Sequence, residues 1–410
     1  MKTIVSVTPT SLEADSRSFK IAATFARLGY GSVVVESQTS NLDRTALPFE
    51  LRSMQDLPLL QERFRSLGSR HQRAGLDEAW RRLVYSTPAL PFLYLLWHLL
   101  YDVLIPLKYI PRASLYYLHG HQLYPAVYIL SKRYKAPIIY DAHDFYSGIL
   151  SCREIAARNF GRRWMMAFHR CLESRLIRNA SAVITVSQGV AELQEHAFGR
   201  HPIVIRNCHD PRIERHPPMS LRGTLVLSSD QFLVVVVGNC KPGMAIREAL
   251  DAMVELPARV HLAFVGRFYE EHLSHIRQRQ LQDRVHIVGP VKPQELVPFI
   301  RSADASVLLY YSRSANYKNC LPNGLFQAIA AGLPLLYPEL PEIKRIAERY
   351  SLGIPIDPQV AGSIVKAVIQ LMNNPSLSAT FRRNLQTAGK ELSWESEERI
   401  LQTLISAALK

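Results

Sequence analysis

The chain has 410 residues, 48% of them hydrophobic, and a formal net charge of +14. The length exceeds one typical domain and predicts two, and the apolar content is enough for real cores. The positive charge lies mainly before residue 215 and predicts anionic partners, either a membrane surface or a phosphorylated lipid; nucleic acid is disfavoured because no basic–aromatic recognition motif accompanies the charge.

Five cysteines are scattered along the chain: Cys152, Cys171, Cys208, Cys240 and Cys320. Their number is odd and no CxxC pair occurs, so the spacing predicts neither a disulfide framework nor a zinc site. A reducing cytoplasm fits this usage. The N-terminal residues MKTIVSVTP are too short and too rich in β-forming residues for a signal peptide, and they predict a first strand.

The first elements predict a strand–helix–strand unit of a parallel sheet. Residues 3–7 read as a short apolar strand, residues 16–28 as a helix that Gly29 and Gly31 end, and residues 32–36 as the next strand. The loop after the first strand lacks the GxGxxG pattern, so dinucleotide binding is disfavoured.

An arginine-rich segment over residues 63–82 precedes residues 83–101, which carry no formal charge. The uncharged stretch is just long enough to span a bilayer, but Pro88 and Pro91 within it and Asp102 after it argue against a spanning helix. A buried helix of the first domain is the preferred interpretation. A surface-lying amphipathic element that meets anionic headgroups is the alternative, and the two can coexist.

Two further strands run out into polar loops that contain histidines. Residues 115–118 lead into HGHQLYP and residues 137–140 into DAHDFYSG. Open parallel sheets place ligands at the carboxyl ends of their strands. Four polar side chains are therefore expected at one edge of the sheet: His119, His121, His143 and Asp144. A single histidine is more often structural than catalytic, and two such loops at consecutive strand ends leave both roles open.

The rest of the chain predicts a boundary and a second parallel sheet. A helix over residues 155–178 carries many arginines, which usually form a solvated face. Proline-rich residues 213–223 read as a linker between a first domain over residues 1–212 and a second over residues 224–391. The final helix, residues 392–410, has apolar side chains at helical spacing.

Basic residues follow several strands of the second domain. Residues 232–237 predict a strand buried on both faces, followed by the loop GNCKPG and a helix over residues 245–254. A glycine-bearing loop between a strand and a helix can approach a phosphate closely, and Lys241 can neutralise it, although the motif alone is weak. Arg267 and Lys318 occupy comparable loops; for each cation the alternative is a solvent-facing charge.

The stretch NCLPNGLFQAIAAGLPLLY, residues 319–337, predicts a loop, a helix and a strand. Pro322 is suited to the start of the helix, Gly332 supplies the left-handed residue that ends it, and residues 333–337 read as a buried strand. One stripe of the helix is expected in the core: Leu325, Phe326, Ile329 and Ala330. The N–H groups at the start of such a helix can bind a diphosphate, and a packed helix with ordinary caps is the alternative.

This stretch resembles the donor-site segment of family-four glycosyltransferases of the GT-B fold, whose bacterial members often read LPNK-LFEY-LAAGLPVV. Three positions depart from the pattern. Gly324 stands where the family usually has lysine, and Gln327 stands where it has the glutamate that holds the donor ribose. Asn319 replaces the partner glutamate, eight residues earlier. Both carboxamides can still accept hydrogen bonds from hydroxyls, without the added strength of a carboxylate.

Weaker resemblances to the same family extend over nearly the whole chain. Asp15 and Arg17 look like the D-x-R that opens a helix near the acceptor site; a helix start with an acidic residue at its positive end is an equally good explanation. The LHGH loop looks like an H-x-H loop in which a histidine lies beside the transferred sugar, and His121 is the nearest match. YDAHD looks like the family's YDAHE loop. Asn239 replaces an arginine of the family's diphosphate grip.

The resemblance implies an α/β chain of the GT-B fold: two Rossmann-like parallel-sheet domains face a cleft, and the C-terminal helix crosses back to the first domain. It implies transfer of a sugar from a nucleoside-diphosphate sugar to a lipid-linked or polysaccharide acceptor, with retention of configuration. The setting expected is the cytoplasm, at the inner face of the membrane if the basic surface docks there. The sequence has no Asp-x-Asp pair to hold a metal against a diphosphate, so no metal and no other cofactor are expected.

Candidate residues follow from these matches. The catalytic candidates are His121, His143 and Asp144. The acceptor-binding candidates are Asp15, Arg17 and His119. The donor-binding candidates are Gly238, Asn239, Lys241, Gly266, Arg267, Lys318, Asn319, Pro322, Asn323, Gly324, Leu325 and Gln327. Loss of both glutamates keeps a second hypothesis open, a non-catalytic protein that binds sugar nucleotides or acts as a scaffold.

Overall fold

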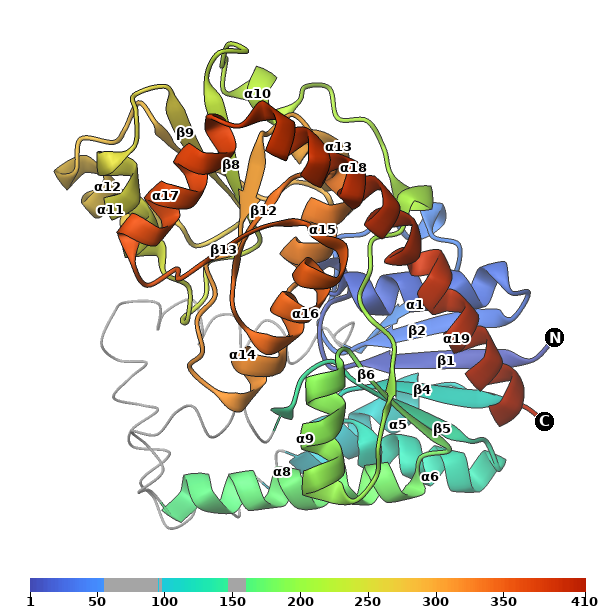
Figure 1. Cartoon of the computed structure of the whole chain (residues 1–410). Coiled ribbons are helices and arrows are strands. Elements are labelled where there is room, and N and C mark those ends of the chain that lie inside the picture. Colours follow the sequence, from blue (N-terminus) through green and yellow to red (C-terminus); the bar gives the residue numbers. More distant parts are fainter. Residues whose placement is uncertain (55–94, 96–97, 147–159) are drawn as a thin grey trace. The chain divides into compact units, whose positions relative to one another are not determined.

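The computed structural model describes residues 1–54, 95, 98–146 and 160–410 (Figure 1). These residues form two compact units, each built around a parallel sheet as the sequence predicts. The N-terminal unit comprises residues 1–186, 191–205 and 400–410, and the C-terminal unit comprises residues 187–190 and 206–399.

The sheet of the N-terminal unit has seven strands in the order β3-β2-β1-β4-β5-β6-β7, and every pair is parallel. The strands predicted over residues 3–7, 32–36, 115–118 and 137–140 are confirmed to within two residues at each end as β1, β2, β4 and β5. Among the seven strands, β3 was not predicted. Their bounds are β1 Thr3–Thr8, β2 Gly31–Glu36, β3 Glu50–Ser53, β4 Leu115–His119, β5 Ile138–Ala142, β6 Ala182–Thr185 and β7 Ile203–Val204.

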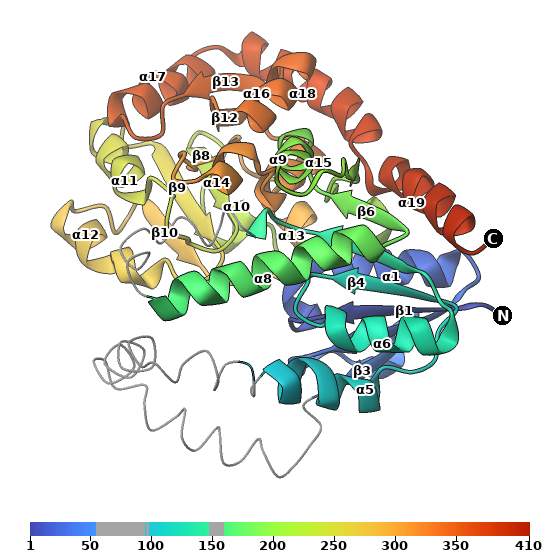
Figure 2. The ribbon, with the colours of Figure 1, turned by 90° about the horizontal axis from the view of Figure 1, so that it is seen from below.

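Helices cover both faces of this sheet, because its strands are apolar on both sides. Ala22 of α1 packs with Val34 of β2 on one face. Leu130 of α6 and Leu176 of α8 pack with Val5 on the other face. Figure 2 shows α5 and α6 on one side of the strands and α1 on the opposite side. The bounds are α1 Ser16–Arg27, α5 Ile105–Tyr109, α6 Tyr124–Tyr134, α8 Phe160–Asn179 and α9 Gln188–Phe198.

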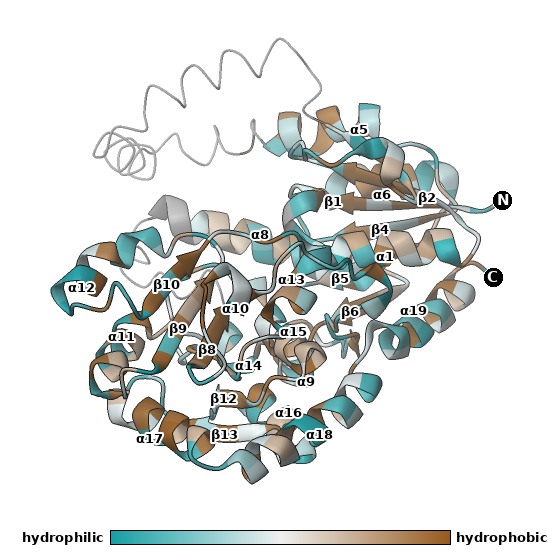
Figure 3. Cartoon of the chain, turned by 90° about the horizontal axis from the view of Figure 1, so that it is seen from above, coloured by the Kyte–Doolittle hydropathy of each residue, from teal (hydrophilic) through white to brown (hydrophobic). Residues whose placement is uncertain are grey.

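The sheet of the C-terminal unit has six parallel strands in the order β10-β9-β8-β11-β12-β13. β8 is buried on both faces as predicted, and Figure 3 shows β8 and β10 as hydrophobic and the outer helix α12 as mainly hydrophilic. The strand bounds are β8 Phe232–Val237, β9 Val260–Val265, β10 Val285–Val288, β11 Ala305–Val307, β12 Leu335–Pro338 and β13 Gly353–Ile356.

Helix α15, Asn323–Ala331, confirms the element predicted for residues 319–337. Pro322 precedes its first residue, and Gly332 ends it with a φ of 71°. The predicted stripe is buried except for Ala330, which is half-buried. The other elements of this unit are η5 Pro211–Ile213, α10 Leu221–Thr224, α11 Ile246–Glu255, η6 Glu270–His272, α12 Leu273–Gln278, α13 Pro293–Ile300, α14 Ala315–Asn319, α16 Pro341–Tyr350, α17 Ala361–Met372, α18 Pro375–Glu391 and α19 Trp394–Ala408, whose last residues belong to the N-terminal unit.

Two predictions fall largely outside the described residues. These are the arginine-rich segment 63–82 and nearly all of the uncharged stretch 83–101, so the choice between a core helix and a membrane-docking element stays a prediction. Among the helices that the structure describes, none combines the length and the apolar character that crossing a bilayer requires.

Candidate functional site

The carboxyl ends of β4 and β5 bring two of the predicted histidines together. His119 is the last residue of β4, and its Nδ1 lies 3.0 Å from Nε2 of His143 in the loop after β5. The His119 side chain is only 1% exposed, whereas that of His143 is 22% exposed. Burial, followed by the charge of His143, lowers the pKa of His119 to about 3. His143 is therefore the member of the pair that can reach a ligand, and Asp144 beside it is half-buried.

A buried ion pair lies directly beneath these histidines. Both oxygens of Asp141 accept hydrogen bonds from Arg17, each at 2.9 Å, and the Tyr117 hydroxyl donates a further bond of 2.8 Å. Burial alone would raise the pKa of Asp141, but Arg17 brings it well below its usual value. The remaining donor of Arg17 bonds the carbonyl of Ile205 at 2.7 Å.

Arg17 therefore does not match its predicted role as an acceptor ligand. Its side chain is 2% exposed and its guanidinium is occupied by Asp141 and a backbone carbonyl, so it joins strands of the core. Sequence reasoning missed Asp141; the available signal was a carboxylate inside an apolar strand, which requires a buried partner.

Asp15 caps helix α1, as the alternative explanation proposed. Its Oδ1 accepts from the Ser18 N–H at 3.1 Å and its Oδ2 accepts from the Ser18 hydroxyl at 2.5 Å. Burial would raise the pKa of Asp15, but nearby His143, His119 and the hydrogen bonds of Ser18 lower it. Its Oδ2 lies 3.8 Å from Nδ1 of His143, so Asp15 orients the one histidine of this pair that is partly exposed.

His121 lies apart from the other two histidines. Its Nε2 is 2.8 Å from Nδ1 of His169 on α8, and the ring of Tyr146 packs against it with a centroid distance of 5.0 Å. Its side chain is buried, and burial followed by the charge of His169 lowers its pKa to about 3. At neutral pH this imidazole is uncharged, and its Nδ1 has no hydrogen-bond partner among the described residues.

His119, Asp141 and His143 place potential ligand atoms within 4.8 Å of one another, as metal ligands would. The donor set does not fit a cation, however. Both Asp141 oxygens are already used by Arg17, and the fixed guanidinium charge beside them repels a second positive ion.

In the C-terminal unit, close backbone contacts form the carboxyl end of β8. A Cβ atom on Gly266 would lie 2.1 Å from the carbonyl oxygen of Gly238, so only glycine fits where the loops after β8 and β9 touch. The Tyr269 hydroxyl donates to the same carbonyl at 2.9 Å. The Asn239 side chain accepts from the Arg267 N–H at 3.1 Å. Asn239, in place of the family's arginine, thus joins two loops.

Helix α15 begins against the same strand end. A Cβ on Gly324 would lie 2.8 Å from the carbonyl oxygen of Val237, which explains why a side chain is absent where the family has lysine. Asn323 is exposed at the start of the helix, with Pro322 half-buried before it. Leu325 is fully buried and its N–H donates to Pro322 at 3.0 Å, so it supports the helix from the core instead of contacting a ligand as predicted.

The basic and carboxamide candidates remain available to a ligand. Lys241, Arg267 and Lys318 are exposed, and none forms an ion pair with a carboxylate in the described part of the chain. Gln327 is half-buried on α15, and its carboxamide makes no hydrogen bond to any described residue. Asn319, at the end of α14, bonds the carbonyl of Ala315 through its Nδ2 at 2.8 Å, which leaves its Oδ1 as an acceptor.

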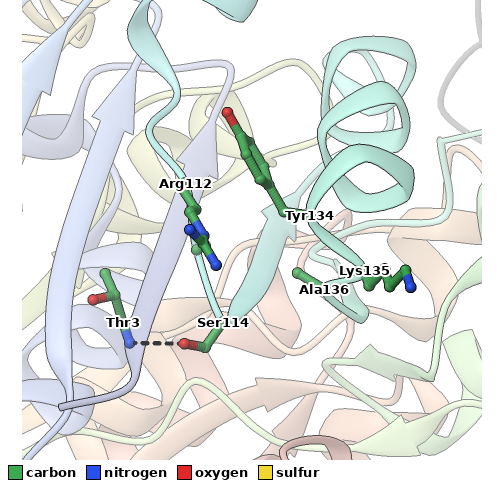
Figure 4. A pocket seen from close by; sticks show the side chains of 7 residues that line it. Thr3, Arg112, Ser114, Tyr134, Lys135 and Ala136 are labelled. Atoms are coloured by element: carbon green, nitrogen blue, oxygen red, sulfur yellow. Dashed lines mark hydrogen bonds between the residues drawn. The ribbon is translucent and has the colours of Figure 1, made fainter.

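A pocket of about 320 Å³ lies elsewhere, at the amino-terminal ends of β1 and β4 (Figure 4). Thr3, Arg112, Ser114 and Tyr134 line it, and the Thr3 N–H donates to Ser114 Oγ at 3.2 Å. Parallel sheets bind ligands at the opposite, carboxyl edge, which is where the candidate residues lie. The pocket is therefore separate from the candidate site.

Comparison with known structures identifies the fold class of the protein. The fold of the whole chain is that of GT-B glycosyltransferases. It superimposes on sucrose-phosphate synthase from Thermosynechococcus elongatus with a TM-score of 0.69 at 16% identity, covering 99% of each chain. It superimposes on the Anabaena protein HepE in complex with UDP-glucose with a TM-score of 0.66 at 17% identity, covering 99% of this chain and 100% of that one. It superimposes on WaaG, a glycosyltransferase involved in lipopolysaccharide biosynthesis, with a TM-score of 0.62 at 15% identity. The superposition covers 97% of this chain and 99% of that one.

Residues 231–374, which make up most of the C-terminal unit, match the model of the family Glycosyl transferases group 1. No curated protein sequence matches the chain. With this family match and the GT-B fold, the chain is a glycosyltransferase, as the resemblance in residues 319–337 predicted.

Proposed function

We propose that the chain transfers a sugar from a nucleoside-diphosphate sugar to a saccharide or lipid-linked acceptor, without a metal ion and with retention of configuration. The observation that carries the proposal is the carboxyl end of β8, where only glycine fits at the contact between two loops and the exposed cations on those loops, Lys241 and Arg267, form no ion pair within the described chain. The Anabaena relative binds UDP-glucose, which supports a donor of this class.

In this proposal the leaving diphosphate is stabilised by fixed positive charge. The first N–H groups of α15 have no partners within the helix and suit an anion. Lys241, Arg267 and Lys318 supply full charges that can meet the negative charge developing on the leaving group. Gln327 and Asn319 bind the ribose hydroxyls through their oxygens. A metal ion has no evident task in this arrangement.

The N-terminal unit binds the acceptor in this scheme. His143 is the partly exposed imidazole at the edge of its sheet, held by Asp15 and His119, and we assign it the positioning of the transferred sugar or the acceptor hydroxyl. His121, neutral and buried, retains one free nitrogen that can accept a hydrogen bond. We also propose that the basic charge of this unit brings the enzyme to the inner face of an anionic membrane.

A donor screen tests the proposal. UDP-, GDP- and TDP-sugars are added to the purified chain, and the melting temperature and the release of free nucleotide are recorded. A ligand that binds only the folded state raises the melting temperature. Replacing Lys241, Arg267 or Lys318 by glutamine should in each case lower the affinity for the productive donor about tenfold, as expected for one lost charge-assisted contact. Lys366→Gln, an equally exposed lysine of α17, is the matched control and should change nothing.

The non-catalytic alternative is favoured by one observation, the two carboxamides at positions where the family has glutamates. Gln327→Glu separates the two functions. If the native chain is an enzyme, it turns over donor before any substitution, and the glutamate variant changes only affinity. Turnover that appears solely in Gln327→Glu would establish the binding-protein alternative.

A second experiment addresses the membrane. Cosedimentation with anionic vesicles, and its loss in zwitterionic vesicles or at high salt, is expected if the basic surface docks. Binding to oligonucleotides in place of anionic vesicles would overturn the membrane assignment.

A further inference from the structure

Three potential metal ligands meet at the loop after β8 in the C-terminal unit. Cys240 lies in the loop after β8, and Glu271 and His272 lie in η6, after β9. The Cys240 Sγ is 3.5 Å from the Glu271 Oε1 and 3.6 Å from the His272 Nε2. The third edge, from His272 Nε2 to Glu271 Oε1, is 3.5 Å.

These three distances are those of a tetrahedral zinc site. Zinc binds sulfur at about 2.3 Å, imidazole nitrogen at about 2.05 Å and carboxylate oxygen at about 2.1 Å. With tetrahedral angles, the ligand atoms are then separated by about 3.6 Å for sulfur–nitrogen and sulfur–oxygen and about 3.4 Å for nitrogen–oxygen. We propose that Cys240, Glu271 and His272 bind a thiophilic divalent cation of the zinc class, with the fourth coordination position open to solvent.

The surroundings hold the ligand-bearing loops in place. The Cys240 N–H donates to the Arg267 carbonyl at 2.9 Å, and the His272 N–H donates to the Tyr269 carbonyl at 3.0 Å. Tyr269 in turn bonds the Gly238 carbonyl at 2.9 Å, so both loops are joined through backbone contacts. A cation therefore meets three ligands that are already ordered, which reduces the entropy lost on binding.

The carboxylate of the site is not held by a basic side chain. Within the described chain, Glu271 forms no ion pair with a lysine or arginine, and its side chain is 67% exposed. The site differs in this respect from His119, Asp141 and His143, where an arginine already holds the carboxylate. One thiolate and one carboxylate would give the cation two negative ligands, and the imidazole a neutral one.

The proposal extends beyond sugar transfer, and its test does not require activity. The purified full chain is stripped with a chelator and titrated with Zn²⁺ against a chromophoric competitor. Co²⁺ is used in parallel, because thiolate coordination gives a near-ultraviolet charge-transfer band. We expect one tight site per chain, a cobalt–thiolate band, and a rise in melting temperature on loading.

Variants identify the ligands. Cys240→Ser should abolish the cobalt–thiolate band. Glu271→Gln and His272→Gln should each lower the affinity for Zn²⁺ at least about tenfold, because even residues that only support metal ligands have effects of that size. Glu271 is exposed, so its variant keeps the fold and remains informative if another variant is unstable. His201→Gln is the matched control, because His201 also pairs with a glutamate, at 2.6 Å, but without a thiol.

Two results would overturn the proposal: equal Zn²⁺ affinity in the native chain and in all three ligand variants, or the absence of a thiolate band in the native Co²⁺ complex. In either case the cluster is a hydrogen-bonded contact between loops. The donor screen described above can be run in chelator and does not depend on this cluster, so failure here leaves the proposed transferase function standing.

Discussion

The buried ion pair beneath the N-terminal site gives the strongest quantitative prediction. Arg17 and Asp141 are 2% and 0% exposed, joined by two hydrogen bonds of 2.9 Å. Arg17→Met preserves most of the side-chain volume and removes the charge. Asp141 then keeps the Tyr117 hydroxyl, at 2.8 Å, as a donor to its side chain.

The magnitude follows from desolvation. Removing one member of a buried pair leaves an uncompensated charge, which costs about 3–5 kcal/mol. The carbonyl of Ile205 also loses its bond from Arg17, so the upper part of that range is expected. For a domain of 150–250 residues, each kcal/mol lowers the melting temperature by about 2–4 °C. The variant should therefore melt about 8–20 °C lower.

Calorimetry and urea unfolding at pH 7 measure this loss, and the double variant Arg17→Met/Asp141→Asn completes a cycle. The neutral pair leaves no buried charge, so it should be more stable than Arg17→Met alone. Arg17 holds the pKa of Asp141 low in the native chain, which stabilises the fold above the unfolded pKa. Without Arg17 that pKa rises, and the deficit of Arg17→Met should shrink as the pH falls toward about 4. This reasoning would be refuted if Arg17→Met lowered the free energy of unfolding by less than about 1 kcal/mol, or if the double variant were no more stable than Arg17→Met.

Three other substitutions have outcomes set by single contacts. Burial, opposed by a 2.8 Å bond from Tyr140, raises the pKa of Glu173 to about 7, so its contribution is favourable below the unfolded pKa and is lost as the pH rises through 7. The free energy of unfolding of Glu173→Gln, measured in urea, should therefore exceed that of the native chain by up to about 3 kcal/mol at pH 9 and by little at pH 4. Gly324→Lys, which restores the family residue, should lower stability by about 1–3 kcal/mol, because its Cβ would lie 2.8 Å from the Val237 carbonyl; a stable variant with tighter donor binding would contradict this explanation. Gly266→Ala should lower the urea concentration at which the C-terminal unit unfolds and should abolish donor binding, because its Cβ would lie 2.1 Å from the carbonyl oxygen of Gly238.

The sequence predicts the fold well because its signals are local. β8 has the predicted bounds, and Gly332 adopts the left-handed conformation expected at the end of α15. Continuous β-branched runs, helical spacing and glycine stops each depend on residues close in the chain. The alternation of strands and helices then leaves parallel sheets as the simplest solution, and both sheets are wholly parallel.

The contents of the sites are predicted less well, because they depend on partners distant in sequence. Arg17 and Asp141 are separated by 124 positions, and nothing local shows that the arginine faces inward. Cys240 lies 32 positions from His272, without the short CxxC spacing by which zinc sites are usually recognised. The prediction that His119 and His143 meet succeeded because both follow adjacent parallel strands, whose carboxyl ends necessarily share an edge.

The two sheet edges differ in how they use charge, and the difference bears on their tasks. At the N-terminal edge the arginine, the aspartate and the first histidine are buried and satisfy one another, so that edge presents mainly His143 and Asp144. A surface with few fixed charges suits a neutral hydroxyl acceptor. At the C-terminal edge, Lys241, Arg267 and Lys318 have no acidic partner in the described chain, and close glycine contacts bring bare backbone to the same place. Unpaired cations repel one another unless an anion joins them. The exposed cations of this edge can pair with a polyanionic ligand, which is why the donor diphosphate belongs to the C-terminal unit in the mechanism we propose.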